Sequence, residues 1–98
     1  MKLSEREREI IAAFFADKPV KRAFLFGSYA RGDADNSSDI DLLIEWDYNQ
    51  AIGWKWIGYW KELQNRLQKK VDFVSDRWLD PKISSFVHHD KELIYERQ

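Results

Sequence analysis

The stretch FLFGSYARGDADNSSDIDLLIEWD, residues 24–47, places two glycines, an arginine and two closely spaced aspartates between apolar runs. Apolar residues at its two ends predict two β-strands, and the glycines and polar residues between them predict a turn and a loop. Asp39 and Asp41 flank a single residue at the start of the second strand. Because alternate side chains of a strand point to the same face, we expect these two carboxylates to project together, away from the face of Ile40 and Leu42.

Two carboxylates that share one place are costly unless a positive charge neutralises them. Mg²⁺ is bound in proteins by a few carboxylates together with phosphate oxygens and water, so the pair predicts a metal site. Gly27 ends the first strand, and Ser28 is expected to cap a single helical turn that ends at Gly32. Such a turn offers free N–H groups to an anion, and Arg31 adds a charge-assisted contact. The stretch therefore predicts a site for a metal-bound nucleoside triphosphate.

Two other motifs of similar composition are excluded by their spacing. A P-loop places lysine after its second glycine, whereas Asp33 follows Gly32 here. An EF-hand loop that began at Asp33 would need glycine at its sixth position and glutamate at its twelfth, where the chain has Ser38 and Ile44. A solvated acidic loop accounts for Asp33, but it does not account for Asp41 between two apolar residues.

Helices and strands alternate in the rest of the chain, which is typical of an α/β fold. A capping-box signal at Ser4 and Glu7 opens the first helix. Trp56, Trp60 and the leucines that follow them at helical spacing form the apolar stripe of a later helix, and both tryptophans are expected in the core. The expected helices cover residues 4–16, 52–68 and about eight residues from Asp80, and the expected strands cover 20–26, 39–46, 71–74 and 93–95. We expect one domain over residues 1–98, with a mixed sheet flanked by helices.

Composition excludes several classes of protein. The 98 residues contain no cysteine, so no disulfide framework or thiolate zinc site is possible. The 16 basic and 17 acidic residues nearly cancel, which predicts no direct binding to nucleic acid or to a membrane. The charged N-terminus is unlike a signal peptide, and the longest apolar run, residues 10–16, is too short to cross a bilayer. A cytoplasmic location is therefore expected.

The spacing of the glycine turn and the aspartates resembles the signature of the DNA polymerase β-like nucleotidyltransferases. Gly27-Ser28, ten intervening residues and Asp39-x-Asp41 match that signature, and the string that includes Arg31 resembles the minimal nucleotidyltransferase (MNT) branch. The run VDFV, residues 71–74, is similar to the strand that carries the third carboxylate of the family. The resemblance implies the polymerase β-like fold.

The resemblance also implies a role for each motif residue. The implied catalytic and metal-binding residues are Asp39, Asp41 and Asp72, and two Mg²⁺ ions are expected. Asp72 would complete the metal site or help to deprotonate the acceptor. The implied nucleotide-binding residues, which would hold the phosphates of ATP, are Gly27, Ser28 and Arg31.

MNT proteins are typically antitoxins that are paired with HEPN-domain toxins. The resemblance implies a Mg²⁺-dependent protein adenylyltransferase, which moves AMP from ATP to a hydroxyl of the toxin, a tyrosine being expected, within a hetero-oligomer. One alternative is an inactive antitoxin that neutralises its toxin by binding alone. A second alternative is nucleotidyl transfer to a small molecule. The residues that contact the adenine stay open, and Trp54 and Tyr59 are expected to pack in the core or at the surface, with base stacking or a partner contact as the alternative.

Overall fold

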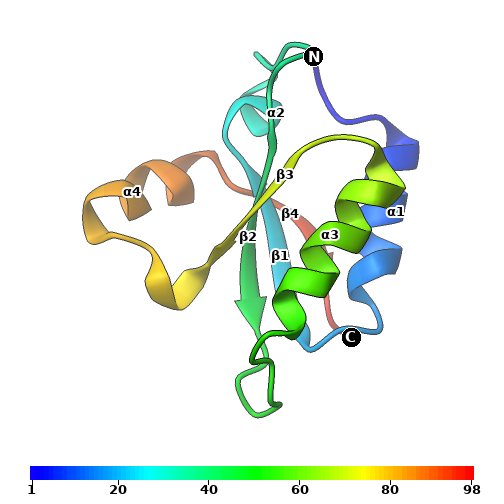
Figure 1. The fold of residues 1–98 in the computed structure, drawn as a ribbon. Helices are drawn as coiled ribbons and strands as arrows, with labels where there is room; N and C mark the ends of the chain where they lie inside the picture. The colour runs from blue at the N-terminus through cyan, green and yellow to red at the C-terminus, as the bar shows by residue number, and fades with distance from the viewer.

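A four-stranded mixed sheet lies at the centre of the molecule, with helices on both of its faces (Figure 1). The computed structural model describes the backbone of residues 1–98 and every side chain except those of Trp78, Ile83 and Phe86. The strands are β1 (Val20–Phe26), β2 (Ile40–Trp46), β3 (Val71–Ser75) and β4 (Glu92–Glu96). Their order is β3-β2-β1-β4, in which β1 is antiparallel to β2 and β4, and β2 is parallel to β3. The expected α/β architecture is confirmed.

Helices on opposite faces of the sheet enclose two apolar clusters. The helical segments are α1 (Glu5–Phe15), α2 (Ser28–Arg31), α3 (Lys55–Leu67), the 3₁₀ turn η1 (Asp76–Trp78) and α4 (Pro81–Asp90). Helices α1 and α3 lie together on one side of the sheet, and α4 lies on the other side (Figure 1). Within the described residues, no helix is both long enough and apolar enough to pass through a bilayer.

Strand β2 is buried on both faces, which fixes the direction of its side chains. Ile40, Leu42 and Ile44 are fully buried in the main core, beneath α1 and α3. Leu43 points the other way and packs with Phe24 and Val87 in a second cluster against α4. Asp41 is therefore directed to the face opposite the main core, as the alternation predicts.

Most element boundaries agree with the sequence, and the largest difference lies before α3. This helix begins at Lys55, three residues later than expected. The segment before it is a loop in which the buried Asp47 carboxylate accepts hydrogen bonds from Asn49 N, Gln50 Nε2 and Arg97, and in which Gly53 has a φ of +49°. As a result Trp56 lies in the first turn and is 40% exposed, so its expected place in the core is wrong.

A one-turn helix, α2, joins β1 to the polar loop. Its N-cap is Gly27, so the expectation that Ser28 would be the cap is wrong by one residue. Gly27 has φ +75° and ψ −153°, a conformation that is essentially confined to glycine. A Cβ at this position would also overlap the Oδ2 atom of Asp41. Glycine is therefore required both by the backbone conformation and by the closeness of the turn to Asp41. The turn ends at Gly32, which is left-handed with φ +87°.

We predict that Gly27→Ala lowers the free energy of unfolding by about 2 kcal/mol or more, because it adds backbone strain to a steric overlap. The matched control is Gly58→Ala, since Gly58 lies within α3 and a Cβ there would meet no atom within 4 Å. The control should raise the free energy of unfolding by about 1 kcal/mol through helix propensity. Urea denaturation of both variants measures the difference, and equal effects would contradict this account of the turn.

Candidate active site

The pairing of three strands brings the predicted site residues to one end of the sheet. Phe26, the last residue of β1, pairs with Asp41 near the start of the antiparallel β2. Asp41 pairs in turn with Asp72, near the start of the parallel β3. The turn that follows Phe26 therefore lies beside Asp41, and Asp39 immediately precedes the first residue of β2. Residues that are far apart in the sequence meet because β1 runs toward the end at which β2 and β3 begin.

The carboxylates at this end of the sheet interact strongly with one another. Burial, followed by the nearby charges of Asp72 and Asp39, raises the pKa of Asp41 to about 6, and Arg31 acts in the opposite direction. Asp72 is the direct strand neighbour of Asp41 in the pairing of β2 with β3. The native fold thus holds negative charge together where a cation would lower its energy.

This carboxylate set fits a divalent cation that is shared with a phosphate ligand. Among the side chains that the structure describes, no three acidic or histidine groups are gathered closely enough to form a complete metal site. Mg²⁺ rarely requires such a cage, because it is usually bound through one or two carboxylates, with waters and substrate phosphates as the other ligands. Asp41 and Asp72, with Asp39 nearby, supply the one or two carboxylates that such a Mg²⁺ site needs.

The first turn of α2 presents backbone donors on the β1 side of the carboxylates. The N–H groups of Ala30 and Arg31 both donate to the carbonyl of Gly27, at 3.1 and 3.0 Å. The N–H groups of Ser28 and Tyr29 come earlier in the helix, so they have no intrahelical acceptor. Two donors at the start of a helical turn suit an anion, as the sequence predicts.

Arg31 connects α2 to the end of α4. Its guanidinium donates to Asp90 at 3.0 Å and to Asp33 at 3.3 Å, and its side chain remains half exposed. These ion pairs direct the arginine along the same side of the sheet as Asp41, whose pKa it lowers. A phosphate group would offer Arg31 a stronger partner than an exposed carboxylate. The expected phosphate contact of Arg31 stays a prediction.

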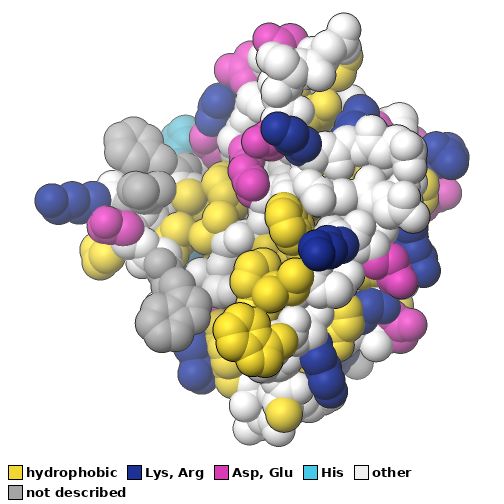
Figure 2. Space-filling view, in the orientation of Figure 1, with side chains coloured by type: hydrophobic (Ala, Val, Ile, Leu, Met, Phe, Trp, Pro, Cys, Tyr) yellow, Lys and Arg dark blue, Asp and Glu magenta, His cyan; other side chains and the backbone are white. Residues whose placement is uncertain are grey.

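A cavity of about 440 Å³ opens on the β3 side of the same carboxylates. It is lined by Asp39, Trp60, Gln64, Lys70, Val71 and Asp72. Figure 2 shows the surface that includes this region, where hydrophobic side chains gather in a row beside α3 and acidic and basic side chains meet at one end of the row. Residue spacing does not predict this cavity, because it places Trp60 on the apolar stripe of a helix and does not reveal how α3 packs on β3.

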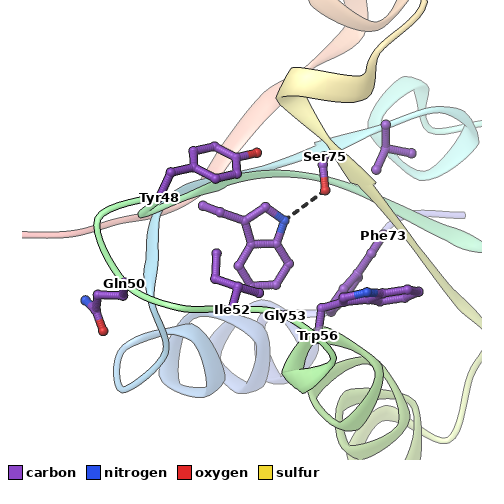
Figure 3. A pocket seen from close by; sticks show the side chains of 9 residues that line it. Tyr48, Gln50, Ile52, Gly53, Trp56, Phe73 and Ser75 are labelled. Atoms are coloured by element: carbon purple, nitrogen blue, oxygen red, sulfur yellow. Dashed lines mark hydrogen bonds between the residues drawn. The ribbon is translucent and has the colours of Figure 1, made fainter.

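A larger cavity of about 600 Å³ lies at the other end of β2 and β3 (Figure 3). It is lined by Trp46, Tyr48, Gln50, Ile52, Gly53, Trp56, Phe73, Val74 and Ser75. The indole N–H of Trp46 donates to the hydroxyl of Ser75 at 2.9 Å, as the dashed line shows. None of these lining residues is charged, and none is a predicted catalytic residue. Tyr59 stacks on Trp46, whereas Trp54 is 83% exposed and does not line the cavity.

We predict that Asp41→Asn stabilises the metal-free protein at pH 7.5 by on the order of 1 kcal/mol, after allowance for solvent screening. The raised pKa means that the stability contributed by protonated Asp41 is present below about pH 4 and is lost as the pH rises through about 6. Because asparagine does not ionise, the variant does not lose this stability. The difference in free energy of unfolding between the variant and the wild type should therefore grow as the pH rises between those values. Urea unfolding in the presence of a chelator measures it.

Asp35→Asn is a control that should change the free energy of unfolding in the opposite direction. Hydrogen bonds from Ser37 lower the pKa of the Asp35 carboxyl, so its charged form favours the fold. This control should therefore destabilise the protein at pH 7.5. A variant Asp41→Asn that is less stable than the wild type at this pH would contradict the repulsion inferred at the site.

Known proteins are similar to this chain in sequence and in fold. The family model described as "Polymerase beta, Nucleotidyltransferase" matches residues 8–98. A protein of Methanocaldococcus jannaschii named "Putative protein adenylyltransferase MJ0435" is 35% identical over 81 residues, which are 83% of this chain and 85% of the relative. A solved structure described as "putative minimal nucleotidyltransferase" is 30% identical, with a TM-score of 0.76 over 89% of this chain and 88% of that one.

The fold recurs in a solved toxin–antitoxin complex. A chain of the tri-AMPylated Shewanella oneidensis HEPN toxin in complex with MNT antitoxin matches 98% of this chain and 75% of its own length, with a TM-score of 0.73 and 18% identity. At that identity the likeness concerns the fold alone. The family match over nearly the whole chain and the relatives at 30% identity or more carry the conclusion that this chain belongs to the polymerase β nucleotidyltransferase family, in its minimal nucleotidyltransferase branch.

Proposed function

We propose that this protein transfers AMP from ATP to a tyrosine hydroxyl of a partner HEPN-domain toxin and thereby acts as its antitoxin. The observation that carries the proposal is the meeting of Asp39, Asp41 and Asp72 with the anion-binding turn of α2 at one end of the sheet. The relative's name as a protein adenylyltransferase and the AMPylated toxin in the related complex support a protein acceptor.

In this proposal the α2 turn and Arg31 bind phosphate, and the three aspartates bind metal. The N–H groups of the α2 turn bind the terminal phosphates of ATP, and Arg31 exchanges a carboxylate partner for a phosphate oxygen. The carboxylates of Asp39, Asp41 and Asp72 would hold Mg²⁺, for which two ions are expected. When it is bound, the metal supplies positive charge against the charge that develops on the phosphates. The protein otherwise contributes position, as is usual for phosphoryl and nucleotidyl transfer.

The reaction forms one bond and breaks one. The acceptor oxygen attacks the α-phosphorus, and a new P–O bond forms as the bond to the bridging oxygen breaks. Pyrophosphate leaves with that electron pair, and the hydroxyl proton passes to Asp72 or to water. Asp72 suits this task because it lies on the β3 side of the site, away from the phosphate-binding turn.

The intact mass of the protein encoded beside this one tests the proposal, after incubation with this chain, ATP and Mg²⁺. A gain of one or more AMP units is expected with the wild type and not with the variant Asp39→Asn/Asp41→Asn. The variant Glu5→Gln/Glu9→Gln changes two exposed carboxylates of α1 by the same chemistry and should retain transfer. This control loses the same two negative charges as the test variant, but outside the proposed site.

Two results of this experiment would favour a different function. An unchanged mass together with a tight complex between the two proteins would indicate an antitoxin that acts by binding alone. Neither modification nor complex formation would direct the search to a small-molecule acceptor. Full transfer by the variant Asp39→Asn/Asp41→Asn would show that these carboxylates are not the catalytic groups.

A further inference from the structure

The strand order separates the two sides of the reaction. The phosphate-binding turn follows β1, whereas the 440 Å³ cavity lies against β3, and β2 with Asp39 and Asp41 runs between these strands. In-line displacement requires the attacking oxygen and the leaving pyrophosphate to lie on opposite sides of the α-phosphorus. If the pyrophosphate is held at the β1 side, the attacking hydroxyl must therefore arrive from the side of β3.

We propose that this cavity, lined by Asp39, Trp60, Gln64, Lys70, Val71 and Asp72, binds the acceptor side chain and selects a tyrosine that has acidic neighbours. We name it the acceptor cavity. The inference rests on the proposed function, because it places the acceptor of that reaction. Its volume of about 440 Å³ lies within the usual range for pockets that bind small ligands or single side chains.

Fixed walls from α3 and β3 shape the acceptor cavity. The indole N–H of Trp60 donates to the carbonyl of Val71, which holds the ring in a single orientation. The side-chain carbonyl of Gln64 accepts from Val71 N at 3.0 Å, which holds the amide in the same way. Both side chains are partly buried, and both are positioned before any acceptor arrives. A pre-ordered aromatic wall beside two carboxylates suits a planar group with an acidic proton, and the tyrosine phenol is such a group.

Positive charge at the rim of the acceptor cavity favours a tyrosine that has acidic residues beside it in the partner's sequence. Lys70 lines the cavity, is exposed, and forms no ion pair with a described side chain. Lys69 is adjacent and pairs with Glu7 at 2.7 Å. A partner segment that places acidic residues beside its tyrosine would gain attraction from Lys70, whereas a basic segment would be repelled. Lys70 thus acts as a specificity residue and not as a catalytic group.

The test uses two synthetic peptides, each with a central tyrosine, flanked by glutamates in one and by lysines in the other. Binding to the full chain, with Mg²⁺ and a non-hydrolysable ATP analogue present to offset the charges of Asp39 and Asp72, is followed by NMR, in which the indole N–H of Trp60 and the side-chain amide of Gln64 report on the acceptor cavity. The wild type should bind the acidic peptide about tenfold more tightly than the basic one, a difference of about 1.4 kcal/mol. The signals of Trp60 and Gln64 should shift, and that of Trp54 should not.

Lys70→Glu should abolish or invert this preference and should leave the affinity for Mg²⁺ with a non-hydrolysable ATP analogue unchanged. Lys55→Glu makes the same charge change at the exposed start of α3, outside the acceptor cavity, and should keep the wild-type preference. The same peptide preference in Lys70→Glu and Lys55→Glu would overturn the proposal. NMR signal changes centred on Trp46 and Trp56, which line the larger cavity, would also overturn it. Undetectable binding of both peptides, or a loss of nucleotide affinity in Lys70→Glu, would also overturn it.

The two proposals fail in different ways. Peptide binding in the acceptor cavity without AMP transfer to any protein would retain the cavity and overturn the proposed function. AMP transfer to the partner that is identical in Lys70→Glu and in the wild type would retain the function and overturn the cavity as its acceptor site.

Discussion

The half-buried position of the Asp41 carboxylate, beside two others at one end of the sheet, constrains the structure around it. Burial first, and then the charges of Asp72 and Asp39, raise the pKa of Asp41, so its charged form is costly in the native fold. A cost of this kind persists only where the surroundings hold the groups in place. Here the surroundings are the apolar residues of β2, which are fully buried and leave the strand no freedom to turn Asp41 away.

The same constraint explains why glycine precedes α2. The backbone of Gly27 approaches Asp41 so closely that a Cβ would overlap its carboxylate. A phosphate held at this turn would therefore lie next to the carboxylate oxygens of Asp41, with no side chain between them. The antiparallel pairing of β1 with β2 produces this closeness, because Phe26 pairs directly with Asp41. The parallel pairing of β2 with β3 then adds Asp72 on the opposite side.

Much of this arrangement can be predicted from the sequence, because local patterns determine it. The alternation of Asp39 and Asp41 with apolar residues predicts both the strand and the face on which Asp41 lies. The residue spacing also predicts the α2 turn, although its cap is Gly27 because the turn begins with a backbone conformation that serine cannot adopt without strain.

What depends on long-range packing could not be predicted. The exposure of Trp56 follows from a loop that Asp47 ties to Arg97, a residue fifty positions away in the chain. The cavity beside β3 likewise forms only when α3 lies against that strand, and neither Gln64 nor Lys70 belongs to a motif. Local spacing therefore predicts which carboxylates meet at one end of the sheet, whereas tertiary packing determines the surface beside them.

Calorimetric titration with a non-hydrolysable ATP analogue would determine whether the carboxylates and the α2 turn form one metal–nucleotide site. The wild type and Asp41→Asn would be compared in Mg²⁺ and in a chelator. The account predicts saturable binding to the wild type in Mg²⁺, and a loss of about tenfold or more in affinity either without the metal or in the variant, although the variant remains folded. Equal affinity in all of these conditions would show that the nucleotide binds elsewhere, and would contradict the account.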